Sequence, residues 1–557
     1  MFHETYSMVR QILEDETGLA DVQLVEGGDH ADLASTVSFA LAKSRRRSPA
    51  EIARELAEKI SVKMSPDMLT AEAQGPYINI RFGPTYVRRS IERAILPGYG
   101  SLPRRATRVA LEHTSANPNG PLHVGHIRNS IIGDTLARCF RKAGYRLEIQ
   151  YYVNDMGRQI AIVVWGIDNI RVDRILDEKS DHYIARIYIA ANREIEADPG
   201  IVSGIDCLMQ RVESVESGDE ETVSKFRTAV SECLEGFKIT LSRLRVCHDR
   251  FIWESDFVRN GDTNKFLDRI RRLDEYRDDG KVWLDLSTAG FEKGYVLRRS
   301  DGTSVYAARD LAYHVWKGRN FDRVIDVLGA DHKLIGAQLQ ATLSLLGERK
   351  PEIVYFEFVS LPEGSMSTRA GKFVSADELM NEVTKRALNE VTERRPDLPD
   401  EQRHSIAESV AIAAIRYDIV RISPEKSTVF DWKEALNFER QSGPYIQYAH
   451  ARACSILEKA GVFHEAYEFT DEREIAVAKQ IAKFPHVIVT VVDELKPQHL
   501  AAYARDLADL FNAFYHFEPV LKSEGIVRES RLTLVKAVRN TLGEALTTLG
   551  IDAIETM

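Results

Sequence analysis

The sequence has few cysteines and no long apolar run. Its five cysteines are scattered through 557 residues without a C-x-x-C pair, which argues against structural zinc, a redox pair or a disulfide framework. No apolar run approaches membrane-spanning length, and residues 1–16 alternate charged and apolar residues, unlike a secretory signal. No repeat or low-complexity segment is evident. We therefore expect a cytoplasmic protein that has no membrane partner.

An excess of positive charge is also lacking. The formal net charge is −10, but this does not exclude a nucleic-acid partner, because binding follows local basic surface rather than the total. With 44% hydrophobic and 28% charged residues, the composition is that of an ordinary globular protein. A chain of 557 residues is too long for one hydrophobic core, so we expect several domains.

A loop between a predicted strand and a predicted helix carries the strongest chemical signal. Residues 108–113 have the pattern of a buried strand, residues 127–143 have helical spacing, and residues 146–153 have the pattern of a second strand. Together they predict a β-α-β unit. Its loop lies at the carboxyl end of the first strand, where open α/β sheets bind ligands.

Two histidines stand three residues apart at the start of this predicted helix. His123 and His126 therefore project from one face, beside the backbone N–H groups and the positive dipole end that favour phosphate. Gly125 leaves that face open, so a flat ring such as adenine can lie against the backbone. The short pattern alone also fits ordinary capping histidines, but its strand-turn-helix context favours a nucleotide site.

A second candidate site is predicted in residues 296–313. The pattern indicates a strand, a tight turn at Asp301-Gly302 and a helix from Tyr306, on which Tyr306 and Asp310 share a face. A carboxylate beside a phenol suits a guanidinium, which makes paired hydrogen bonds to acceptors and stacks on rings. Taken alone, such a pair is more often a surface hydrogen bond.

These motifs resemble those of one known family. Residues 112–129, E-H-T-S-A-N-P-N-G-P-L-H-V-G-H-I-R-N, resemble the first signature of class I aminoacyl-tRNA synthetases in its arginyl form. Residues 299–310, R-S-D-G-T-x-x-Y-x-x-R-D, resemble the arginyl-specific segment, and residues 154–159, N-D-x-G-x-Q, match the same family. Residues 443–452, G-P-Y-I-Q-Y-A-H-A-R, resemble the start of its anticodon-binding bundle. The resemblance covers essentially the whole chain.

The resemblance implies a ligase that joins L-arginine to tRNA(Arg) with ATP and Mg²⁺ and without structural zinc. Arginine would be activated to arginyl-adenylate and transferred to the 2′-hydroxyl of the terminal tRNA adenosine. No dedicated general base stands out, so alignment and charge stabilisation are expected to carry catalysis. The expected catalytic residues are His123, His126, Arg369 and Lys372. We expect a monomer.

The implied binding residues form three groups, and no protein ligand to a metal is expected. The residues expected to bind ATP are His123, Gly125, His126, Met366 and Ser367. The residues expected to bind arginine are Glu112, Ser115, Asn117, Tyr306, Asp310 and His332. The residues expected to bind tRNA are Tyr77, Asn79, Tyr445, Tyr448, Arg452 and Met557.

The sequence departs from the family pattern at two places. His332 stands where the family usually has Gln, and an imidazole lacks the reach of an amide that donates and accepts from one end. Residues 364–372 resemble the second class I signature in a reduced form, with Ser365 and Thr368 where lysines stand elsewhere. Because a leaving pyrophosphate needs positive charge, Arg369 and Lys372 are the expected replacements.

The expected fold is multidomain α/β with three parts. Residues 1–95 would form an N-terminal α+β additional domain that binds tRNA, with a helix over residues 29–43 and a strand over residues 76–82. Residues 96–400 would form a Rossmann-like catalytic domain with a parallel sheet and a helical insertion at about 160–290. Residues 401–557 would form an all-α anticodon-binding bundle.

Three other interpretations remain open at this point. A small-molecule nucleotidyltransferase also uses H-x-G-H on a β-α-β loop, but it needs neither the N-terminal domain nor the helical C-terminal third. A catalytically impaired paralogue that acts as an RNA-binding protein is compatible with the reduced second signature, in which Ser365 and Thr368 stand in place of lysines. A synthetase for another amino acid is the third, and the missing zinc-ligand spacing argues against a cysteine-specific enzyme.

Overall fold

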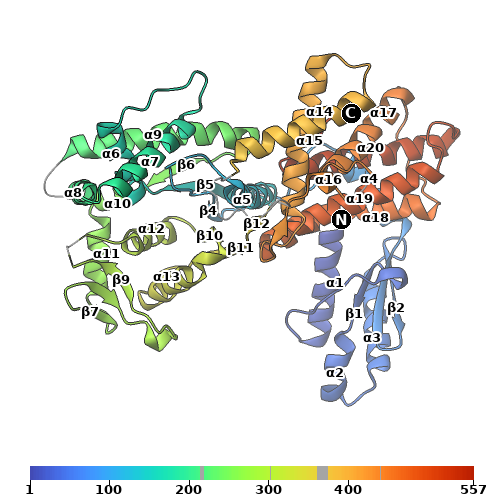
Figure 1. Cartoon of the computed structure of the whole chain (residues 1–557). Coiled ribbons are helices and arrows are strands. Elements are labelled where there is room, and N and C mark those ends of the chain that lie inside the picture. Colours follow the sequence, from blue (N-terminus) through green and yellow to red (C-terminus); the bar gives the residue numbers. More distant parts are fainter. Residues whose placement is uncertain (214–218, 301–302, 361–373, 440) are drawn as a thin grey trace.

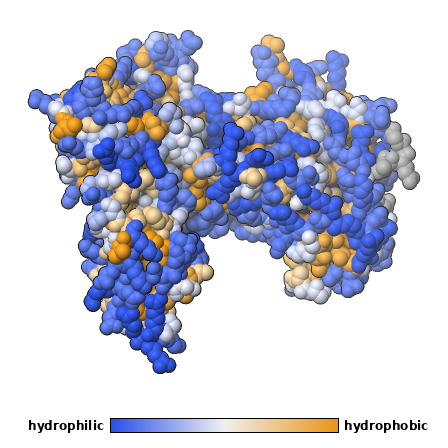
Figure 2. All heavy atoms as spheres, turned by 180° about the vertical axis from the view of Figure 1, so that it is seen from behind, coloured by the Kyte–Doolittle hydropathy of each residue, from blue (hydrophilic) through white to orange (hydrophobic). Residues whose placement is uncertain are grey.

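The computed structural model describes residues 1–213, 219–300, 303–360, 374–439 and 441–557, which form three regions in chain order (Figure 1). A small N-terminal domain lies beneath a C-terminal helical bundle, and a larger region built on a parallel sheet lies beside that bundle. Seen from behind, the surface is mostly hydrophilic and its hydrophobic residues form small separate patches (Figure 2). The expected multidomain α/β fold is confirmed.

The N-terminal domain packs helices against a three-stranded antiparallel sheet of order β1-β3-β2. The strands are β1 Leu33–Ser35, β2 Leu69–Gln74 and β3 Tyr77–Phe82. The helices are α1 Phe2–Thr17, α2 Val37–Arg45, α3 Pro49–Lys63 and α4 Pro84–Ala94. The strand expected over residues 76–82 is confirmed, but the single helix expected over residues 29–43 is wrong.

That predicted helix is interrupted by strand pairing. Residues 33–35 pair antiparallel with β3, so that Leu33 lies opposite Ile80 and is buried. The helix begins only at Val37. The free edge of β3 offers backbone hydrogen-bonding groups that a local helical pattern does not account for.

The central sheet has five parallel strands in the order β11-β10-β4-β5-β6. The strands are β4 Arg108–Glu112, β5 Arg146–Val153, β6 Arg250–Trp253, β10 Arg323–Gly329 and β11 Glu352–Phe356. Helix α5, Val124–Lys142, joins β4 to β5, so the expected β-α-β unit is confirmed. β4 is buried from Val109 to Glu112, as expected of a strand covered on both faces.

The strand order places the loop after β4 at a switch point of the sheet. From β4 the chain continues to β5 and β6 on one side and reaches β10 and β11 later on the other side. The connections that leave β4 and β10 therefore diverge at the carboxyl edge of the sheet. A crevice at such an edge is where open α/β sheets bind ligands.

Helices and a small antiparallel sheet elaborate this region. The helices between β5 and β6 are α6 Arg158–Asn169, α7 Ser180–Ala197, α8 Ile201–Glu213 and α9 Glu220–Arg243. After β6 come α10 Glu254–Arg259, α11 Asp262–Ile270, β7 Tyr276–Asp278, β8 Val282–Leu284, β9 Tyr295–Arg298 and α12 Tyr306–Asn320. After β10 come α13 Lys333–Leu345, β12 Val359–Ser360 and α14 Ala376–Arg394. The turn expected at Asp301-Gly302 lies outside the described residues.

The C-terminal region is a helical bundle, as expected. Its elements are α15 Asp400–Val420, β13 Thr428–Val429, α16 Trp432–Ala435, α17 Gly443–Ala460, α18 Glu472–Glu494, α19 Gln498–Phe517 and α20 Gly525–Thr548. One helix in the described part of the chain, α18, is long and apolar enough to cross a membrane by length and composition. It packs against α4, α19, α20 and α5, and this place inside the bundle accounts for its apolar residues.

Ion pairs join the bundle to the other two regions. Lys479 of α18 contacts Asp32 of the N-terminal domain at 2.8 Å. Arg416 of α15 contacts Asp134 of α5 at 2.6 Å, and both of these side chains are buried. Removing one partner of a buried pair is strongly destabilising. Helix α5, which carries the two histidines, is therefore firmly attached to the bundle.

Candidate active site

The turn that begins α5 is capped by its own two histidines. The backbone N–H of Gly125 donates to Nδ1 of His123 at 3.1 Å, and the backbone N–H of His123 donates to Nδ1 of His126 at 3.3 Å. The two rings stack with their centroids 3.7 Å apart and their planes 23° apart. Both imidazoles therefore lie on one face, as expected, and they also cap the helix.

These contacts fix where the protons of the two rings lie. Burial lowers the pKa of His126 to about 3 and also lowers the pKa of His123, so both rings are neutral at pH 7. A ring nitrogen that accepts a hydrogen bond carries no proton, so each ring has its proton on Nε2. Neutral rings of this kind suit the expected role of the two histidines as hydrogen-bond donors to phosphate oxygens.

Gly125 is required by the position of the His123 ring. A Cβ at residue 125 would lie 2.9 Å from Cε1 and 3.1 Å from Nδ1 of His123. We predict that Gly125→Ala displaces this ring and lowers the kcat of the expected aminoacylation by about 10- to 100-fold, the usual effect of misplacing a reacting or positioning group by about 1 Å. Gly204→Ala in α8 is the matched control, because the nearest atom to its Cβ is 4.0 Å away. Equal losses in both variants would contradict this role.

The backbone before the turn adopts a conformation that non-glycine residues rarely adopt. Thr114 and Ser115 have φ angles of 71° and 38°, a region that costs such residues about 1–3 kcal/mol. Helix α5 supports this bend, because Asn129 Oδ1 accepts the N–H of Thr114 at 2.8 Å and Ser130 Oγ lies 2.8 Å from Thr114 Oγ1. The bend brings Ser115 Oγ within 3.0 Å of Glu112 Oε1. Strained backbone of this kind clusters at functional sites.

One cleft joins the predicted nucleotide and arginine sites. Its volume is about 530 Å³, which suits a small-molecule ligand. The predicted contacts among its lining residues are Glu112, Ser115, Asn117, His123, Gly125, His126, Tyr306, Asp310 and His332. Every predicted nucleotide or arginine contact within the described residues therefore lies in the same cleft.

The two carboxylates predicted to receive the guanidinium are buried and paired with cations. Glu112 is 7% exposed and Asp310 is 8% exposed. Lys317 Nζ donates to Glu112 Oε2 at 2.8 Å, and His314 Nδ1 lies 3.2 Å from Asp310 Oδ1. Tyr306 lies one helical turn before Asp310 and lines the same cleft. Helix α12 and β4 thus present a phenol and two carboxylates to one cavity.

The two residues predicted to hold the backbone of arginine are oriented by protein contacts. Ser115 Oγ accepts the N–H of Tyr152 at 3.0 Å and donates to Glu112. Asn117 Nδ2 donates at 3.0 Å to Oε1 of Gln159, which ends the N-D-x-G-x-Q motif. Ser115 therefore also helps to hold the Glu112 side chain in place, and Gln159 helps to hold the Asn117 side chain in place.

The two departures from the family pattern have different outcomes. His332 lines the cleft at a half-exposed position, 3.7 Å from the Asp331 carboxylate. The segment that resembles the second signature lies outside the described residues, and so do the residues predicted within it, Met366, Ser367, Arg369 and Lys372. Ser375, just beyond it, forms a β-bridge with His123. The chain therefore leaves that segment beside the histidine turn.

Two clusters in the described part of the chain have the spacing of a metal site. They are Glu112, His314 and Asp326, and Asp181, His182 and Asp377. In the first, Lys317 Nζ lies 2.8 Å from Glu112 and 2.6 Å from Asp326. In the second, Lys179 Nζ lies 2.6 Å from Asp377. Because a lysine ammonium already pairs with the carboxylates of each cluster, we assign no metal to either.

Sequence reasoning missed four residues that support the site, namely Asn129, His314, Lys317 and Asp326. A signal for two of them was present, because Tyr306, Asp310, His314 and Lys317 recur at helical spacing along one face of a largely buried helix. Asp326 interrupts the apolar run of β10, which is a weaker signal. Asn129 ends the stretch that resembles the first signature, but its contact with Thr114 depends on the bend of the preceding loop, which the sequence does not show.

Among the predicted tRNA contacts, Tyr448 and Arg452 form an exposed stack on the bundle. The Arg452 guanidinium lies 4.7 Å from the centroid of Tyr448 and 5.5 Å from that of Tyr515. Both tyrosines are 39% exposed. Such a surface can stack on unpaired bases, and Tyr515 is a member that sequence reasoning missed.

Tyr445 differs from its two predicted companions. It is 8% exposed, and its hydroxyl donates to Asp509 Oδ1 at 2.6 Å. The ring is therefore buried in the bundle, and its contact with tRNA stays a prediction. Tyr445 instead joins α17 to α19.

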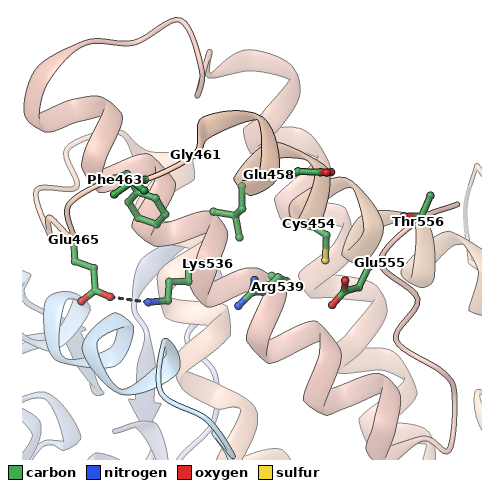
Figure 3. A pocket seen from close by; sticks show the side chains of 11 residues that line it. Cys454, Glu458, Gly461, Phe463, Glu465, Lys536, Arg539, Glu555 and Thr556 are labelled. Carbon is green, nitrogen blue, oxygen red and sulfur yellow. Dashed lines mark hydrogen bonds and ion pairs between the residues drawn. The ribbon is translucent and has the colours of Figure 1, made fainter.

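The remaining predicted tRNA contacts lie on β3 and at the chain end. Tyr77 is exposed and packs edge-on against Phe39, whereas Asn79 Nδ2 donates to Gln74. The carbonyl of Met557 accepts a hydrogen bond from Arg395 at 3.1 Å. The tail before it lines a second cavity, whose labelled residues include Cys454, Lys536, Arg539, Glu555 and Thr556 (Figure 3). The chain end is therefore fixed on the bundle beside this cavity.

Three family models match the chain in order. The model described as the arginyl tRNA synthetase N terminal domain matches residues 7–82. The model of the class I (R) tRNA synthetase catalytic domain matches residues 98–432, which is more than half of the chain. The DALR anticodon binding domain matches residues 446–557.

Curated relatives and solved structures match over the full length. Arginine–tRNA ligases of Methanoregula boonei and Methanospirillum hungatei are 65% and 64% identical to this chain, covering 100% of both partners in each case. The structure of Thermus thermophilus arginyl-tRNA synthetase gives a TM-score of 0.89 at 31% identity and covers 100% of both chains. That of Plasmodium falciparum, with a TM-score of 0.80 at 17% identity over 100% of this chain and 99% of that chain, supports the fold alone. The resemblance expected from the motifs is thus confirmed, and the chain belongs to the class I arginyl-tRNA synthetase family, the arginine–tRNA ligases.

Proposed function

We propose that this cleft performs both steps of arginine attachment. The arginine carboxylate attacks the α-phosphorus of ATP, which gives arginyl-adenylate and releases pyrophosphate. The 2′-hydroxyl of the terminal tRNA adenosine then attacks the arginyl carbonyl, which forms the ester and releases AMP. Alignment of the reactants and hydrogen bonds to the phosphate oxygens carry the catalysis.

The proposal assigns each described cleft residue one part of the substrates. The residues that contact ATP are His123, Gly125 and His126, and those that contact arginine are Glu112, Ser115, Asn117, Tyr306, Asp310 and His332. The single observation that carries this assignment is that the two histidines and the buried carboxylates of Glu112 and Asp310 line one cleft. The donors suit phosphate oxygens without adding charge, and the carboxylates suit a guanidinium.

The second signature supplies the positive charge in this proposal. By resemblance, Met366 and Ser367 contact the nucleotide, while Arg369 and Lys372 stabilise the leaving pyrophosphate. Mg²⁺ is proposed to enter with ATP on the phosphate oxygens, as it commonly does. Most described carboxylates of the cleft are buried and already paired with cations, and the exposed exception is Asp331.

ATP–pyrophosphate exchange with each standard amino acid, with and without tRNA, tests the proposed function. Exchange that depends on arginine alone would support it. Exchange with a different amino acid would contradict it. Failure with every amino acid, although tRNA still binds, would favour a catalytically impaired paralogue that acts as an RNA-binding protein.

We further propose that this translation enzyme works in the cytoplasm as a monomer. Light scattering behind a sizing column tests the oligomeric state directly. A mass equal to one chain supports the proposal, and a mass of two chains contradicts it.

The exposed stack on the bundle gives a prediction about tRNA. We expect Tyr448→Ala to raise the KM for tRNA by about 10- to 100-fold, because stacking on one base contributes about 1–3 kcal/mol. The KM values for ATP and arginine should not change. Aminoacylation at varied tRNA concentration measures the effect.

A matched control for this variant is available in the helical insertion. Tyr183 lies beneath the guanidinium of Arg174 at 4.4 Å, so Tyr183→Ala removes a similar arginine-stacked ring from another part of the surface. We expect it to leave the KM for tRNA unchanged. A wild-type KM in the Tyr448 variant would remove this residue from the tRNA interface.

A further inference from the structure

Five ionisable side chains form one continuous cluster at the floor of the cleft. Lys317 Nζ donates to Glu112 Oε2 at 2.8 Å and to Asp326 Oδ1 at 2.6 Å. His314 Nε2 lies 2.8 Å from Asp326 Oδ2, and its Nδ1 lies 3.2 Å from Asp310 Oδ1. All five are buried, so their charges interact in an environment of low polarity.

The two cations of this cluster remain charged at neutral pH. Burial alone would lower the pKa of Lys317, but the carboxylates of Asp326 and Glu112 raise it. Burial and the neighbouring Lys317 act to lower the pKa of His314, but Asp310 and Asp326 raise it to about 10. The Lys317 ammonium also lies 4.2 Å from the centroid of the Tyr313 ring, which adds a cation–π contact.

The charges therefore sum to minus one. Two cations and three carboxylates leave one negative charge in the cluster, and a single guanidinium would neutralise it. Arg309, which directly precedes Asp310 on α12, does not belong to this cluster, because it pairs with Glu213 and Glu254. His314, Asp326, Asp310 and Glu112 line the cleft, whereas Lys317 lies behind them.

We propose that Lys317 and His314 are positioning residues that set the specificity of the cleft for a side chain with one positive charge. Lys317 holds Glu112, His314 holds Asp310, and Asp326 anchors both cations. This inference rests on the proposed roles of Glu112 and Asp310 toward arginine. Burying ions is unfavourable where apolar side chains would pack as well, so a cluster of this size is more readily explained by ligand recognition than by stability.

Discrimination against neutral side chains follows from the charge balance. Citrulline has nearly the shape of arginine but no positive charge, so it would leave the negative charge of the cluster buried and unbalanced. Without Lys317, Glu112 and Asp326 would be neighbouring carboxylates that lack their shared cation and repel each other. Glu112 would then lose the contact that holds it toward the ligand, and with it the site's discrimination between charged and neutral side chains.

Lys317→Met, whose side chain has similar length but no charge, tests the proposal. We expect the KM for arginine to rise by about 100-fold, because breaking a buried ion pair is strongly unfavourable and part of that loss falls on the ligand. The KM for ATP should stay within about twofold. The ratio of the inhibition constant for citrulline to the KM for arginine should fall by at least about tenfold, and Lys317→Arg should recover part of both losses.

His314→Gln provides the second variant, because it keeps hydrogen-bonding capacity but removes the positive charge between Asp310 and Asp326. It should raise the KM for arginine in the same way. Asp134→Asn is the matched control, since it removes a buried carboxylate paired with Arg416 outside the cleft. It should lower the melting temperature without changing the KM for arginine. Circular dichroism establishes that each variant is folded.

The outcomes separate this inference from the proposed function. If Asp310→Ala raises the KM for arginine but Lys317→Met and His314→Gln do not, the inference is overturned and the proposed site stands. A KM for ATP that rises as much as the KM for arginine would also overturn it, because the role would then be structural. If Asp310→Ala itself leaves the KM for arginine unchanged, the proposed site falls. Should Lys317→Met fail to fold, the His314→Gln and Lys317→Arg results decide the inference alone.

Discussion

Replacing Asp310 with alanine is expected to raise the KM for arginine by about two to three orders of magnitude. The side chain is buried and faces the cleft one helical turn after Tyr306. Without it the guanidinium of bound arginine would lose a charged partner in a site that excludes water. Leaving one member of a buried ion pair unpaired costs about 3–5 kcal/mol, and each 1.4 kcal/mol is a factor of ten in affinity.

Steady-state aminoacylation at varied arginine and ATP concentrations measures this effect. A loss confined to the KM for arginine would mean that Asp310 contributes to binding in the ground state and in the transition state alike. Asp331→Ala is the matched control, because that carboxylate also lines the cleft but is 61% exposed in its side chain. We expect it to change the KM for arginine by no more than about threefold. If the two variants behave alike, Asp310 is not part of a desolvated arginine site.

The part of this site that sequence predicts is the part carried by local spacing. The histidines three residues apart and the pair Tyr306 and Asp310 four residues apart depend only on helix geometry, and the structure places all four in one cleft. The same spacing continues to His314 and Lys317, so the sequence contains the information needed to predict that all four residues share one face of α12. Spacing along α12 could not predict Asp326, because this residue contacts His314 and Lys317 from a different element, β10.

Tertiary context explains the other differences between expectation and structure. Residues 33–35 become a strand because β3 offers them an edge, although the local pattern favours a helix. Tyr445 is an aromatic residue of the kind that stacks on bases, but it is buried and its hydroxyl donates to Asp509 of α19. Tyr448, three residues later on α17, is exposed. Residue type and spacing thus identify candidates along a helix, but the neighbouring helices decide which candidates reach solvent.

The chemistry of the histidine turn also depends on contacts that the sequence does not show. H-x-G-H predicts two imidazoles on one face, but it does not predict that each Nδ1 accepts a backbone N–H of the same turn. This mutual cap uses the backbone N–H groups of His123 and Gly125. It also holds both rings in place at the cleft.

Removal of one such donor gives the second large prediction. We expect His126→Ala to lower kcat by about 100- to 1,000-fold, the usual effect of removing a preorganised donor to a developing oxyanion. The KM for arginine should change little, because the proposed partner of this imidazole is the nucleotide. His486→Ala is the matched control, since burial lowers the pKa of this histidine to about 4 but it lies outside the cleft. It should leave kcat unchanged.

The pH dependence of kcat tests whether the donors are neutral. Burial lowers the pKa of His126 to about 3, so this ring does not gain a proton as pH falls from 8 to 6.5. We therefore expect the wild type and the His126→Ala variant to show the same pH dependence of kcat across that range. A wild-type group that titrates near pH 6.5 and is lost in the variant would show that the ring acts as a cation. In that case the missing lysines of the second signature would be compensated by the histidines themselves, and Arg369 and Lys372 would no longer be needed to account for the charge on the leaving pyrophosphate.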